Sequence, residues 1–115
     1  MRNDNYKKVL NLLGLANKAG KLVLGSKANK NLLEKGIYLI LISSDAGPKI
    51  RSFFLQKGEK QGIPVYIFSD SVALGLALGF PPVKVVGFKD PSFASEFLEY
   101  LGADKEVNSN GGGLN

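Results

Sequence analysis

The sequence contains no cysteine and no histidine among its 115 residues. Without cysteine the chain can form no disulfide and has no thiolate nucleophile. The absence of both residue types also excludes Ser–His and Cys–His catalytic pairs and removes the two ligands that zinc prefers. We therefore predict a protein that is not an enzyme and that needs no metal and no cofactor.

The local signatures of nucleotide and cation sites are missing as well. No GxGxxG follows a predicted strand, no GxxxxGK[ST] is present, and the acidic residues form no DxD or ExxE pair. Asp45 and Lys49 could act as an acid–base pair. A helix cap at Asp45 and a surface position for Lys49 form the favoured interpretation.

Long hydrophobic runs are also lacking. The longest apolar stretch, Ile37 to Ile42, is the size of a strand, whereas a membrane span needs roughly 18 to 20 apolar residues. The first ten residues, MRNDNYKKVL, lack the apolar segment of a signal peptide. We expect a cytoplasmic protein that does not enter a membrane.

The composition that is present fits one soluble domain with a real core. Hydrophobic residues make up 44% of the chain and charged residues 22%. The net charge of +5 is uneven, because residues 1–35 carry +6 and residues 36–115 carry −1. This asymmetry favours a basic surface near the N-terminal third that attracts a polyanion. A solvated helix face is the alternative explanation.

Apolar periodicity predicts alternating helices and strands, and hence an α/β fold with helices on both faces of a parallel or mixed sheet. Ile37–Ile42 and Ile63–Phe68 read as strands buried on both faces. We expect one domain over residues 1–101 and a flexible, polar tail over residues 102–115. The expected helices are 5–19, 26–36, 48–62, 70–79 and 92–101, and the expected strands are 22–24, 37–42, 63–68 and 83–88.

Several helix ends are marked by capping residues. Ser44 or Asp45 is expected to cap the third helix, with Pro48 in its first turn. Ser69 or Asp70 is expected to cap the fourth helix, which Gly79 ends.

A basic strand-to-helix turn is the first candidate site. The strand ends at Gly25, and Ser26 can cap a helix whose free N–H groups attract phosphate. Lysines around the turn are expected to contact phosphates, and neighbouring residues to make hydroxyl and amide contacts, with the amides able to pair with base edges. A structural turn and cap is the alternative. The candidate residues are Lys18, Lys21, Gly25, Ser26, Lys27, Asn29, Lys30 and Asn31.

A stiff apolar loop is the second candidate. It lies between the fourth helix and the last strand and contains Phe80, Pro81, Pro82 and Val83. Phe80 and Val83 either close the core or form an apolar platform for an unstacked base, as in sequence-specific RNA recognition.

Four stretches follow one another in the sequence: LLGLANKAGKLVLG, the Gly25 to Gly36 spacing, ILISSDAGPK and LGLALG. Together they resemble the ribosomal protein L7Ae/L30e/S12e/Gadd45 superfamily. The resemblance implies a three-layer α/β/α sandwich with a four-stranded mixed sheet. It also implies binding of kink-turn or related RNA. The implied contacts fall on Gly25, Ser26, Lys27, Lys30, Asn31 and on Phe80 to Val83.

The start of the second helix departs from the archaeal pattern G-x-N-E-x-x-K. Lys27, Ala28 and Asn31 replace its asparagine, glutamate and lysine. The turn glycine and the positive charge are kept. A lysine at the place of Lys27 is similar to the L30e branch.

The sequence therefore predicts a monomeric, non-enzymatic RNA-binding protein, associated with the ribosome or with another structured RNA. The alternative function is a protein-interaction adaptor on the same fold. It would use the Phe80-Pro81-Pro82 loop and the fourth helix to hold a protein partner.

Overall fold

Four strands form one mixed sheet in the order β1-β4-β2-β3. This computed structural model describes residues 3–25 and 36–108. The strands are β1 (Leu22–Gly25), β2 (Leu39–Ile42), β3 (Val65–Ile67) and β4 (Val85–Phe88). β4 runs antiparallel to both of its neighbours, β1 and β2, whereas β2 and β3 are parallel. The predicted four-stranded mixed sheet is confirmed.

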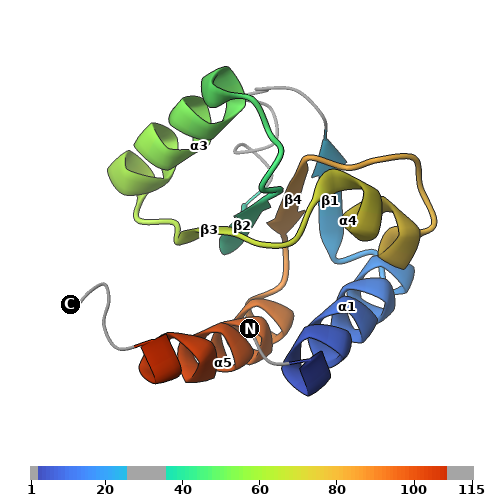
Figure 1. Cartoon of the computed structure of the whole chain (residues 1–115). Helices are drawn as coiled ribbons and strands as arrows, with labels where there is room; N and C mark the ends of the chain where they lie inside the picture. The colour runs from blue at the N-terminus through green and yellow to red at the C-terminus, as the bar shows by residue number, and fades with distance from the viewer. Residues whose placement is uncertain (1–2, 26–35, 109–115) are drawn as a thin grey trace.

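Helices cover both faces of this sheet, as Figure 1 shows. They are α1 (Asn3–Lys18), α3 (Pro48–Gln61), α4 (Ser71–Leu78) and α5 (Pro91–Asn108). α1 and α5 lie on one side and α3 on the other, while α4 packs against α1. The layers are therefore helix, sheet and helix, as predicted. The helix predicted over residues 26–36 lies outside the described residues.

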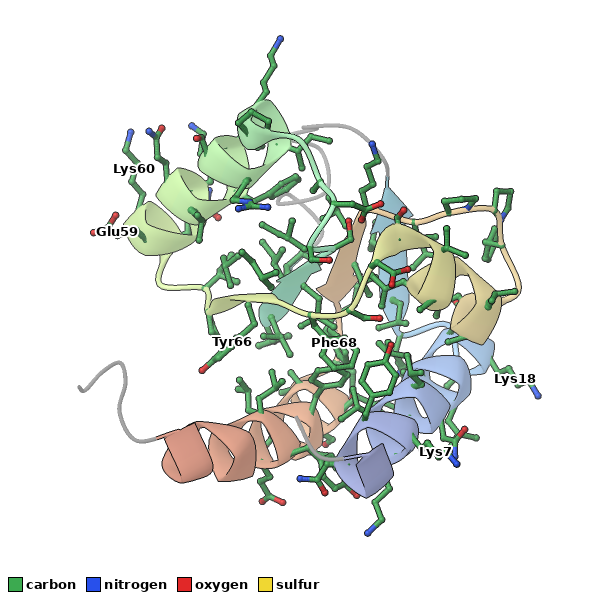
Figure 2. All side chains as sticks on the ribbon, in the orientation of Figure 1. Lys7, Lys18, Glu59, Lys60, Tyr66 and Phe68 are labelled. Atoms are coloured by element: carbon green, nitrogen blue, oxygen red, sulfur yellow. The ribbon has the colours of Figure 1, made fainter. Side chains whose placement is uncertain are left out.

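Two apolar clusters hold the layers together. Leu39 and Leu41 of β2 belong to the cluster under α1 and α5, whereas Ile40 and Ile42 belong to the cluster under α3. Successive residues of a strand point to opposite faces, so a strand buried on both sides must be continuously apolar. Phe68 lies between the sheet and the α1–α5 side, where its ring contacts that of Phe97 edge-on (Figure 2).

The start of α3 differs from the prediction. Its N-cap is Gly47, which makes no side-chain cap, although Pro48 does stand in the first turn. The Asp45 carboxylate instead accepts hydrogen bonds from the backbone N–H and the hydroxyl of Ser71, at 2.9 and 2.6 Å. Two donors on a residue that is distant in sequence outweigh the local cap. The cap predicted for α4 is confirmed, because Asp70 accepts from the Ala73 N–H.

The strand predicted over Ile63–Phe68 is shorter and less buried than expected. β3 covers only Val65–Ile67, and Ile67 is exposed. β3 stands at the edge of the sheet, so it has one neighbouring strand and less cover than β2. The prediction of burial on both faces was wrong for this strand.

The last helix is longer than predicted. α5 begins at Pro91 and ends at Asn108, so the end expected at Leu101 was wrong. A single glycine at position 102 costs only about 1 kcal/mol of helix propensity, and good helix formers follow it. The flexible tail expected over residues 102–115 stays a prediction.

Candidate nucleic-acid interface

The end of β1 and the loop before β4 lie side by side at one end of the sheet. The Lys84 N–H donates to the Gly25 carbonyl, with 3.1 Å between nitrogen and oxygen. Gly25 is paired in register with Val85. Two predicted site segments that are far apart in sequence are thereby joined by the sheet itself.

Ser71 fixes the loop from its other side. The carbonyl of Ser71 accepts a hydrogen bond from the Val83 N–H at 3.0 Å, while its own N–H and hydroxyl bind Asp45. The hydroxyl of Ser71, together with the Ser71 N–H, lowers the pKa of Asp45 from 3.8 to about 2. Asp45 is therefore ionised at neutral pH and anchors the start of α4, from which the loop is held.

Gly75 lets the loop pack directly onto α4. The Phe80 N–H donates to the Gly75 carbonyl at 2.9 Å. A Cβ atom at position 75 would lie 2.5 Å from the Pro81 carbonyl oxygen and 2.7 Å from that of Phe80. Only glycine allows this approach without a shift of the backbone.

The sequence left open whether the loop before β4 closes the core or forms a platform for a base, and the structure gives these two roles to different residues. Val83 is 5% exposed and belongs to the apolar cluster under α1 and α5, so its side chain closes the core. Phe80 is 52% exposed, and Pro81 and Pro82 are exposed too. The apolar surface available to a base is therefore formed by Phe80 and the two prolines. The buried Val83 side chain is not accessible to a base.

Lys18 and Lys21 are not brought together with Gly25. The Lys21 carbonyl accepts from the Lys89 N–H at 2.8 Å, which places Lys21 at the opposite end of β1. A strand of this length spans about 13 Å. Lys18 ends α1 and lines the groove between α1 and α4, and its side chain extends into solvent (Figure 2). Neither lysine therefore lies beside Gly25.

A large part of the predicted site lies outside the described residues. These positions follow Gly25 directly in the chain and are Ser26, Lys27, Asn29, Lys30 and Asn31.

Two residues of this region were missed by sequence reasoning. Lys84 is half-buried beside Gly25 and supplies the hydrogen bond that registers the two segments. Its signal was the strand predicted from position 83, because the bond is donated by the backbone N–H and not by the lysine side chain. Gly75 carried no such signal, because a glycine within a helix does not reveal which segment packs against it.

Neither a group of metal-ligand side chains nor a membrane-spanning helix is found in the part of the chain that the structure describes. Within 3–25 and 36–108 no group of three or more acidic side chains is placed to hold a metal ion. No helix in the same ranges is long and apolar enough to cross a membrane.

The chain matches the model of the ribosomal protein L7Ae/L30e/S12e/Gadd45 family over residues 7–108. It belongs to that family. The family description and the relative below name ribosomal or RNA-binding proteins and no enzyme, in agreement with the prediction of a non-enzymatic protein.

The chain is also similar to one curated relative and to two solved structures. The relative is the RNA-binding protein YlxQ of Enterococcus faecium, which is 26% identical over 102 residues, or 88% of this chain and 98% of YlxQ. A Bacillus halodurans protein of unknown function is 32% identical with a TM-score of 0.76, over 83% of this chain and 97% of that one. The 15.5kD RNA binding protein of Giardia lamblia, 21% identical with a TM-score of 0.66 over 90% and 89% of the two chains, shows the same fold.

Proposed function

We propose that this protein binds structured RNA through the surface formed by the end of β1, the residues after Gly25 and the loop before β4. The observation that carries the proposal is the hydrogen bond from the Lys84 N–H to the Gly25 carbonyl, which holds the end of β1, where the basic segment begins, beside the end of the apolar loop. A phosphate site beside a stacking surface suits RNA with an extruded base. The family and the name of the YlxQ relative support the same partner.

Each segment has its own role in this proposal. Lys27 and Lys30 bind phosphates, and Ser26, Asn29 and Asn31 make hydroxyl and amide contacts. Phe80, with its exposed ring, stacks on an unpaired base. Lys18 and Lys21 extend the basic area at the far end of β1 and contact more distant phosphates. The cellular partner in this proposal is the ribosome or another structured RNA of the cytoplasm.

The target proposed is an irregular internal loop such as a kink-turn. A kink-turn exposes unstacked bases next to closely spaced phosphates, which matches a stacking ring beside a basic turn. Lys27, Ala28 and Asn31 give this chain a different set of side chains from the archaeal pattern. A direct comparison of a kink-turn RNA with a plain duplex therefore tests the proposal.

The experiment measures binding of the full chain to both RNAs across a salt series. Binding led by phosphates weakens steeply as salt rises. Lys27→Ala with Lys30→Ala should reduce the salt slope by about one for each phosphate that the variant no longer neutralises. The matched control, Lys49→Ala with Lys60→Ala, removes the same charge from exposed positions of α3 and should lower affinity less and for both RNAs alike.

Phe80 tests the stacking part separately. Phe80→Ala should weaken binding of the kink-turn RNA by about 1–3 kcal/mol, the usual contribution of one base stacked on an aromatic ring. Leu55→Ala on α3, where Leu55 is 43% exposed, is the control and should have no effect. Failure of the wild type to bind either RNA at low salt would refute the RNA function. Equal binding of both RNAs would refute the kink-turn target alone.

A further inference from the structure

A groove between α1 and α4 carries the largest concentration of exposed aliphatic side chains in the described part of the chain. Leu76 of α4 is 79% exposed, Val72 of α4 is 56% exposed, and Leu15 of α1 is 60% exposed. The groove has a volume of about 680 Å³, and Leu15 and Leu76 line it together with Gly14 and Ala77. Apolar surface of this kind on a soluble protein marks an interaction site.

The helix that forms one wall of the groove is apolar all round. The eight residues of α4, SVALGLAL, contain no charged side chain. A surface helix normally carries charge on its solvent face, and one that is hydrophobic all round is normally covered. Asp70, which precedes the helix, uses its carboxylate to cap the Ala73 N–H. The solvent face of α4 therefore lacks a cover within the described residues.

Lys18 is the charged residue among those that line the groove, and its charge is positive. Lys7 lies on the same stripe of α1, because positions 7, 11, 14 and 18 share one face of a helix. Lys7 and Lys18 both extend away from the body of the protein (Figure 2). An apolar floor between two cationic ends fits a ligand with an apolar stripe and acidic flanks.

We propose that the α1–α4 groove is a docking site for an acidic amphipathic helix of a protein partner. Such a helix presents apolar residues at i, i+3, i+4 and i+7 to Leu15 and Leu76, which line the groove, and to Val72, which lies one turn before Leu76 on α4. Its aspartate or glutamate residues face Lys18 and Lys7. This surface lies away from the Gly25–Lys84 end of the sheet, and Lys18 is the residue that both proposed surfaces would use.

Two other occupants fit the surface less well. The acidic helix of a second copy would be α5, whose Glu96 and Glu99 are exposed. However, α5 has no exposed large hydrophobic residue among its described side chains with which to fill the groove. RNA would find aliphatic side chains, which do not stack on bases as aromatic rings do.

The first test is a titration of the isotope-labelled full chain with two synthetic helical peptides, followed by NMR. Both carry leucine at i, i+3, i+4 and i+7, and one has glutamate flanks and the other lysine flanks. The glutamate peptide should shift the amide signals of α1 and α4 and bind about fivefold more tightly than the lysine peptide at low salt. Equal binding, no binding at about 1 mM peptide, or shifts confined to other elements would overturn the proposal.

Two variants separate the apolar and the charged parts. Val72→Gln with Leu76→Gln should weaken the glutamate peptide by about tenfold or more, whereas Leu55→Gln should not. Lys18→Glu should abolish the preference between the peptides, because it leaves one positive and one negative charge along the groove, whereas Lys60→Glu on α3 should leave the preference unchanged. All these side chains are exposed, so folding should persist, and thermal unfolding checks it. If the Gln pair lowers RNA affinity as strongly as Phe80→Ala does, the groove belongs to the RNA surface and the docking proposal is wrong.

A photo-crosslinking side chain placed at position 76, with position 55 as the control site, identifies the occupant in cells. The crosslinked segment should be an amphipathic helix that bears aspartate or glutamate beside its apolar stripe. Crosslinks to RNA, to a second copy of this chain or to a segment without acidic residues would overturn the proposal. The outcome does not depend on whether the proposed RNA function holds.

Discussion

Replacement of Gly75 in α4 by alanine should displace the loop before β4 while the protein stays folded. The Cβ atom of an alanine would lie 2.5 Å from the Pro81 carbonyl oxygen and 2.7 Å from the Phe80 carbonyl oxygen. Ordinary contact begins at 3.4 Å, so the loop must retreat by about 0.9 Å. Both obstructing atoms belong to the backbone, which cannot turn aside as a side chain can.

The net effect on stability follows from two opposing contributions. Overpacking of this kind costs typically about 1–3 kcal/mol. Replacement of glycine by alanine within a helix returns up to about 1 kcal/mol. The free energy of unfolding should therefore fall by about 1 kcal/mol, which corresponds to a Tm lower by about 4–8 °C for a domain of this size.

Gly14→Ala is the matched control. Its Cβ would lie 3.2 Å from the Ala77 carbonyl oxygen, so the same gain in helix propensity comes with a much smaller clash. We expect an unchanged or higher Tm for this variant. Differential scanning calorimetry compares the two proteins, and NMR follows the amide signals of Phe80 and Val83.

Two results would decide whether the close approach at Gly75 holds the loop in place. If Gly75→Ala is as stable as Gly14→Ala and the loop amides do not shift, the close approach does not constrain the loop. If the loop amides do shift, RNA binding measured well below both Tm values should weaken for Gly75→Ala and stay the same for Gly14→Ala. That second comparison links the position of the loop to the proposed function.

Two further predictions concern stability. Asp45→Ala should lower the Tm at pH 6, because the pKa of about 2 in the folded state lies below the unfolded value of 3.8. The stabilising effect of the carboxylate is present above pH 3.8 and disappears as the pH falls to about 2; a Tm difference between variant and wild type that stays constant over this whole pH range would contradict this. Gly58→Ala should lower the free energy of unfolding in urea by about 1 kcal/mol after the gain in helix propensity, because its Cβ would lie 2.5 Å from Val65 Cγ2 and 2.7 Å from the Ile63 carbonyl oxygen. An unchanged urea midpoint would show that α3 can move away from β3.

The sequence pattern predicted correctly several features that depend on residues close together in the chain. The stops at Gly62 and Gly79 are confirmed by their left-handed backbone, with φ of 71° and 74°. The cap at Asp70 is confirmed because the donor lies three residues away. The apolar runs located β2 and β4, since burial on both faces leaves no alternative to continuous hydrophobicity.

Other features depended on partners that are distant in sequence. Nothing near Asp45 indicates that its donors belong to Ser71, so a helix cap was the natural but wrong prediction. The burial of a strand such as β3 depends on the order of strands in the sheet, which periodicity does not contain.

The candidate site shows the same limit. Sequence named Gly25 and Phe80 as separate candidates, and only the pairing of β1 with β4 reveals that they share one end of the sheet. The same pairing places Lys21 at the other end. The sequence also could not show that Phe80 is exposed and Val83 buried, because both are apolar residues of one short loop.

The central position of β4 has a consequence for the order of events on a growing chain. β4 is the last strand to be synthesised, yet it separates β1 from β2 in the sheet. At roughly 5–20 residues per second, Gly25 leaves the ribosome several seconds before the strand that must pair with it. Until then β1 has no neighbouring strand within the described sheet. The proposed RNA surface is therefore among the last parts of the molecule to form, and a nascent chain that ends before Val85 cannot assemble it.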